Sequence, residues 1–82
     1  MTEIFISISA PSQFEAVGEI NKALGDQGYD ERIAESDFIS EIDDDSAFAG
    51  ESLYTFAISI DDGIESVREA FKGTGVSVEP VQ

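Results

Sequence analysis

Two segments of the chain alternate apolar with mostly polar side chains at a period of two. Their apolar positions are Ile4, Ile6 and Ile8 within residues 3–9, and Tyr54, Phe56, Ile58 and Ile60 within residues 52–60. Because successive side chains of a strand point to opposite faces, both patterns predict strands with one buried face. A shorter apolar segment at residues 76–79, just before Pro80, predicts a last strand.

Two other segments have the spacing of helices. Ser12 and Glu15 form a capping-box pattern, which predicts a helix start, and Asp62 with Glu65 predicts a second one. The apolar positions that follow are Phe14, Val17, Ile20 and Leu24 in the first helix, and Ile64, Val67, Ala70 and Phe71 in the second. Glycines then end each helix, at residues 25 and 28 and at residues 73 and 75.

The segment 29–45 fits two patterns. Ala34, Phe38 and Ile42 keep a helical spacing of four, but from Glu35 onward a period of two fits as well. We favour a strand over 35–43, with Phe38 and Ile42 on one face and the acidic side chains on the other. Residues 43–50 then form a polar loop.

The predicted order is β-α-β-β-α-β in a single domain spanning residues 1–82. This α+β order indicates a ferredoxin-like sandwich, in which a four-stranded antiparallel sheet carries two helices on one face. The even-numbered apolar positions of the strands are expected to face the helices.

Composition excludes several classes of chemistry. The chain has no cysteine and no histidine, which excludes thiolate nucleophiles, zinc-thiolate sites and histidine-dependent triads. A loop starting at Asp43 fails the EF-hand pattern, because Ala47 and Tyr54 stand at its fifth and twelfth positions. We therefore expect no enzyme activity, no metal and no cofactor. An acidic N-terminus and the lack of a long apolar run predict a cytoplasmic protein without membrane partners.

Charge is the strongest positive signal. The net charge is −14, and residues 26–51 hold ten acids against the single base Arg32, a net charge of −9. Direct binding to nucleic acid or to an anionic membrane is disfavoured, because like charges repel. On the predicted strand, Glu35, Asp37, Glu41 and Asp43 form a row on the face away from the helices. Charged edge strands that block aggregation, or adaptation to high salt, would also explain part of this charge.

In its size, its β-α-β-β-α-β order, the acidic segment 35–43 and the sequence Asp43-Asp44-Asp45, the chain resembles small anti-CRISPR proteins encoded by phages. That resemblance implies a non-enzymatic inhibitor that mimics DNA and binds a basic nucleic-acid-binding protein, such as a CRISPR effector, in the host cytoplasm. The alternatives are an immunity protein or antitoxin that neutralises a basic nuclease, and a halophile-type regulatory domain. Ile39 and Phe48 are candidate apolar anchors. The predicted partner-binding residues are Asp30, Glu31, Glu35, Asp37, Ile39, Glu41, Asp43, Asp44, Asp45 and Glu51.

Overall fold

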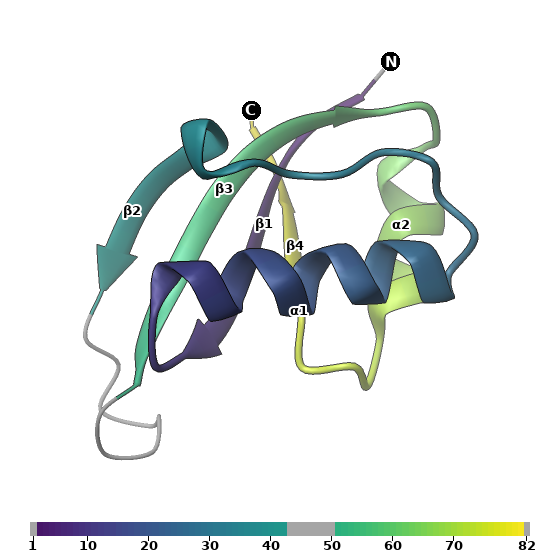
Figure 1. The fold of residues 1–82 in the computed structure, drawn as a ribbon. Helices are drawn as coiled ribbons and strands as arrows, with labels where there is room; N and C mark the ends of the chain where they lie inside the picture. The colour runs from purple at the N-terminus through teal and green to yellow at the C-terminus, as the bar shows by residue number, and fades with distance from the viewer. Residues whose placement is uncertain (1, 43–50, 82) are drawn as a thin grey trace.

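The computed structural model describes residues 2–42 and 51–81, which form one antiparallel sheet covered on one face by two helices (Figure 1). The strands are β1 (Thr2–Ala10), β2 (Phe38–Ile42), β3 (Ser52–Ile60) and β4 (Ser77–Pro80). They lie side by side in the order β2-β3-β1-β4. The helices are α1 (Gln13–Asp26) and α2 (Ile64–Phe71), and a short 3-10 helix, η1 (Glu35–Asp37), precedes β2. The predicted ferredoxin-like sandwich is confirmed.

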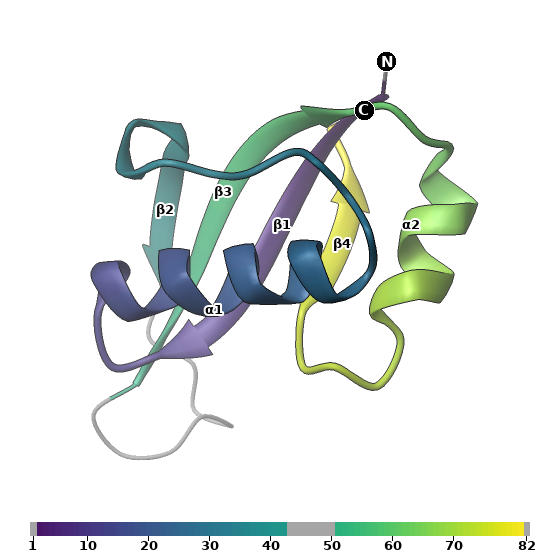
Figure 2. The same cartoon turned by 45° about the vertical axis from the view of Figure 1, so that its right-hand side comes forward.

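The core lies between the helices and the sheet. It contains the even-numbered residues 4–10 of β1, the residues Tyr54, Phe56 and Ile60 of β3, Val78 of β4 and the preceding Val76, largely as the alternation predicted. The helices contribute the buried side chains Ala16, Ile20, Leu24, Val67 and Phe71. In Figure 2, α1 crosses in front of the sheet while α2 lies beside β4. No helix within the described residues is long and apolar enough to cross a membrane.

Helix α1 begins and ends as the sequence predicted. The hydroxyl of Ser12 accepts a hydrogen bond from the amide of Glu15 at 3.2 Å. At the other end, Gly28 has a φ of +85°, and the amide of Tyr29 bonds to the carbonyl of Leu24. This left-handed glycine cap turns the chain back toward the sheet and brings Tyr29 against the core.

The prediction that Phe14 belongs to the apolar stripe of α1 is wrong. Phe14 is 78% exposed, so it does not belong to the core. Ile20 and Leu24 are buried as predicted, together with Ala16. At about 100° per residue, Phe14 lies about 200° around the helix from Ala16, which turns it toward solvent.

The start of α2 also differs from the prediction. Gly63, not Asp62, is the N-cap residue, and no side chain caps the first turn. The carboxylate of Asp62 accepts hydrogen bonds from the amide of Gly63 and from the hydroxyl of Tyr29, each at 2.8 Å. Asp62 thus links the turn before α2 to Tyr29, which follows α1, and does not cap α2.

The predicted strand over 35–43 is wrong in two respects. Its first residues form η1, where the carboxylate of Asp37 accepts from the amide of Ala34 at 2.8 Å. The pairing of β2 with β3 then shifts between Phe38 and Ser40, because Ile39 is an extra residue in a β-bulge. After the bulge, Glu41 pairs with Tyr54, whose side chain is in the core. Glu41 therefore occupies a position on the helix-covered face, opposite to the predicted one.

Candidate functional site

The predicted partner-binding residues do not form a single row. Asp30, Glu35 and Glu41 are exposed, and Ile39 is 53% exposed at the bulge. Glu51 is half-buried directly before β3. Glu31 and Asp37 are also half-buried. The predicted residues Asp43, Asp44 and Asp45, and the candidate anchor Phe48, lie outside the described residues.

Several acids instead surround the end of the sheet where β1 and β2 begin and β3 ends. Glu31 accepts a hydrogen bond from the amide of Asp61 at 2.8 Å, which joins the segment after α1 to the end of β3. Asp62 is bonded to Tyr29 in the same region, and Glu3 pairs with Ser59 across β1 and β3. We call Glu3, Glu31, Asp37, Asp61 and Asp62 the sheet-end acids. The sequence prediction missed Glu3, Asp61 and Asp62, because nothing local shows that residues 31 and 61 meet.

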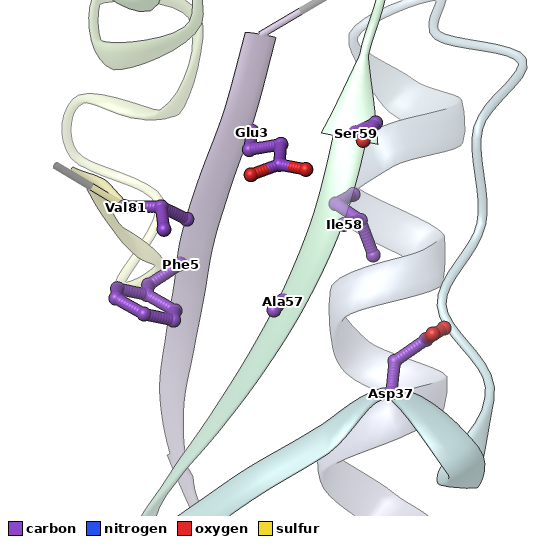
Figure 3. Close-up of a pocket in the computed structure, with 7 residues that line it drawn as sticks. All are labelled: Glu3, Phe5, Asp37, Ala57, Ile58, Ser59 and Val81. Atoms are coloured by element: carbon purple, nitrogen blue, oxygen red, sulfur yellow. The ribbon is translucent and has the colours of Figure 1, made fainter.

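A shallow hollow of about 330 Å³ opens beside the end of β3, and two of the sheet-end acids, Glu3 and Asp37, line it (Figure 3). Glu3 of β1 and Asp37 of η1 lie on either side of β3. Among the described residues, no lysine or arginine lines the hollow. Its lining residues are Glu3, Phe5, Asp37, Ala57, Ile58, Ser59 and Val81.

Few of the carboxylates are balanced by a cation. Between described residues, one ion pair is present, from Arg68 to Glu79 at 3.0 Å. The guanidinium of Arg32 lies among acids but donates to the backbone carbonyls of Tyr29 and Glu31, at 2.6 and 2.7 Å. The other described carboxylates are therefore not neutralised by a cation, although Glu31, Asp37 and Asp62 accept hydrogen bonds within the protein.

The acids are not confined to the sheet end. Both helices also carry exposed carboxylates, so the predicted row of acids on one face of the sheet does not account for all of the surface charge. These helix-layer acids are Glu15, Glu19, Asp26, Glu65 and Glu69. Any account of the charge has to explain both groups.

The sheet-end acids also affect the pKa of Tyr29, which is hydrogen-bonded to one of them, Asp62. Burial raises the pKa of Tyr29 to about 12, and the hydrogen bond to Asp62 and the charges of Asp62 and Glu31 act in the same direction. Removing the proton would place a third negative charge beside two carboxylates. No group of three metal-ligating side chains gathers in the parts of the chain described here, 2–42 and 51–81.

Comparisons with known proteins do not assign this surface. No protein-family model, curated protein or solved structure matches the chain. The arrangement of charge on the fold is therefore the basis for a functional proposal.

Proposed function

We propose that this domain is a non-enzymatic protein inhibitor whose acidic surface binds the basic nucleic-acid-binding site of a partner. The observation that carries the proposal is the uncompensated charge: apart from Glu79, no described carboxylate has a cation within 4 Å. A net charge of −14 on 82 residues repels itself and lowers stability. A partner with a basic groove would relieve that repulsion.

Charge of this kind acts mainly on the rate of association and on the choice of partner. Long-range attraction steers a basic protein toward the surface and weakens steeply as salt rises. The surface would compete with nucleic acid, because both present several negative charges to the same lysines and arginines. A DNA-binding defence complex such as a CRISPR effector is the class of partner that this mimicry fits, in the cytoplasm of the host cell.

Two exposed apolar side chains add short-range contacts to the charged surface. Phe14 is 78% exposed in the first turn of α1, and Ile39 is 53% exposed on β2. The side-chain amide of Gln13 donates to the backbone carbonyl of Glu35 at 3.4 Å, so the first turn of α1 lies against η1. Phe14 precedes the exposed acid Glu15 in this turn, and its exposed ring would serve as an apolar anchor within a charged interface.

A competition experiment tests the proposal. The protein is immobilised and exposed to host lysate at about 0.05 M and about 0.5 M salt, and captured proteins are challenged with duplex DNA. We expect a basic nucleic-acid-binding protein that is retained at low salt and released both by high salt and by DNA. Capture that neither salt nor DNA disturbs would contradict the proposal. The identity of the captured protein distinguishes a defence complex from a nuclease toxin, whose inhibitor would be an antitoxin.

A second candidate is a regulatory domain adapted to high salt, and the exposed acids on α1 and α2 favour it. Adaptation of this kind spreads charge over the whole surface and makes folding depend on molar salt. Thermal unfolding followed from about 0.1 M to about 2 M salt separates the two candidates. The inhibitor is folded and cooperative at the low end of this range, whereas a halophilic domain gains its cooperative transition only at the high end.

A further inference from the structure

Strand β3 extends beyond its neighbour on one side. All nine residues of β3 pair with β1, from Ser52 opposite Ala10 to Ile60 opposite Thr2. On the other side, β2 pairs with β3 only from Leu53 to Phe56. Residues 57–60 therefore have β1 on one side and no strand on the other, within the described chain.

This stretch presents unpaired backbone groups. Successive residues of a strand direct their N–H and C=O groups to alternate sides, so two of the residues 57–60 direct theirs to the open edge. No backbone hydrogen bond outside the sheet joins them to another described segment. The amide of Asp61, just beyond, is occupied by the carboxylate of Glu31. The open stretch is therefore bounded at both ends.

The other edges of the sheet are less suited to pairing. The bulge at Ile39 interrupts the regular pattern of β2, and β4 ends at Pro80, which has no amide hydrogen to donate. Residues 57–60 contain neither a bulge nor a proline. The hollow reaches this same edge, since Ala57, Ile58 and Ser59 line it together with Asp37 (Figure 3).

We propose that an extended, basic segment of a partner adds as a strand to β3 at residues 57–60. Main-chain hydrogen bonds would hold the segment, and its lysines or arginines would lie near Glu3 and Asp37. A second copy of this chain does not fit, because two chains of net charge −14 repel each other. The inference rests on the proposed function and deepens it, since it names the form in which the basic partner binds.

Titration of the labelled protein with the hexapeptide acetyl-Lys-Val-Lys-Val-Lys-Val-amide tests this, with amide signals followed by NMR. We expect the largest shifts at residues 57–60 and at Asp37, and amide exchange at the open edge slowed at least tenfold. The same peptide methylated on all six backbone nitrogens keeps its charge but cannot donate, and should bind at least tenfold more weakly. Equal affinity of the two peptides, or no shift at residues 57–60, would overturn the inference.

Two double variants with the same change of charge test whether the peptide binds at the open edge of β3. Glu3→Lys/Ser59→Lys places two cations beside the hollow, whereas Glu69→Lys/Ser66→Lys makes the same change of charge on exposed positions of α2. The first should weaken peptide binding at least fivefold more than the second, and equal weakening would contradict the site. If the peptide does not bind while DNA still displaces a captured partner, the strand-addition site is wrong and the proposed function stands.

Discussion

The hydroxyl of Tyr29 donates a 2.8 Å hydrogen bond to the carboxylate of Asp62, 33 residues further along the chain. The Tyr29 ring also stacks on Phe71, with centroids 6.1 Å apart and an interplanar angle of 27°. This pair joins the segment that leaves α1 to the turn that starts α2. It fixes the acidic segment around Glu31 against the end of β3, where Glu31 meets Asp61.

Replacing Tyr29 by Phe should therefore lower the free energy of unfolding by about 1 kcal/mol at neutral pH, the usual net contribution of one such hydrogen bond. The pKa of Tyr29 is raised from 10.0 to about 12, so its contribution is complete below pH 10 and is lost as pH rises toward 12. Urea unfolding of both proteins at a series of pH values from 7 to about 11.5 measures this. The stability difference should shrink above pH 10, and a constant difference would contradict the account.

Truncation of Phe56 should cost much more stability than truncation of Phe14. Phe56 is fully buried, so Phe56→Ala should cost about 3–5 kcal/mol of stability. Phe14 is 78% exposed, so Phe14→Ala should change stability by less than about 0.5 kcal/mol. Chemical denaturation of the two variants checks both values. A large loss for Phe14→Ala would restore the sequence-based placement of Phe14 in the core.

Asn21 ties the segment before η1 to α1. Its side-chain amide donates to the carbonyl of Ile33 at 3.0 Å, and its side-chain oxygen accepts from the Ile33 amide at 2.7 Å. Because Ile33 is buried, Asn21→Ala leaves both backbone groups without these partners and should cost about 1–3 kcal/mol. The exposed neighbour gives a matched control, since Lys22→Ala should stay within about 0.5 kcal/mol. Similar thermal shifts for the two variants would show that the Asn21 contacts add little.

Replacement by alanine should raise stability at one glycine of α1 and lower it at the glycine that follows the helix. Gly18 lies inside the helix with open space around the position of a Cβ, so Gly18→Ala should raise stability by about 0.5–1 kcal/mol. Gly28 has a φ of +85°, where a side chain is strained, so Gly28→Ala should lower stability by about 1 kcal/mol. Thermal melts of the two variants report the signs directly. Stabilisation by Gly28→Ala would contradict the left-handed cap.

The fold could be predicted from the sequence because its local signals agree. The alternation in residues 52–60 marks β3 at its observed bounds, and the cap at Ser12 marks the start of α1. The segment before β3 could not be placed in the same way. The alternation of β2 is interrupted at Ile39, because this extra residue moves the side chains that follow it to the opposite face of the sheet. The spacing of apolar residues in the sequence does not reveal such a bulge.

The candidate site was predictable only in part. The excess of acids in residues 26–51 is evident from the sequence. The hydrogen bond between Glu31 and Asp61 is not, because it depends on the tertiary fold. The exposure of Phe14 depends on which face of α1 packs against the sheet, and the apolar spacing alone does not determine that face. The open edge of β3 exists because β2 is shorter than β3, and it can be recognised only when the pairing of the two strands is known.

The central claim is that charge at particular positions, and not net charge alone, binds the partner. Two matched triple variants separate these possibilities, since each changes the net charge from −14 to −8 on exposed positions. Asp30→Lys/Glu35→Lys/Glu41→Lys alters predicted binding residues, whereas Glu19→Lys/Asp26→Lys/Glu69→Lys alters the helix layer.

The most direct measurement is the affinity of each triple variant for the partner captured in the competition experiment, at one fixed salt concentration. The account predicts that the first variant binds at least a hundredfold more weakly than the parent protein, about 2.7 kcal/mol, while the second loses no more than about fivefold. Equal losses in the two variants would show that total charge is responsible, and would contradict a defined acidic binding surface.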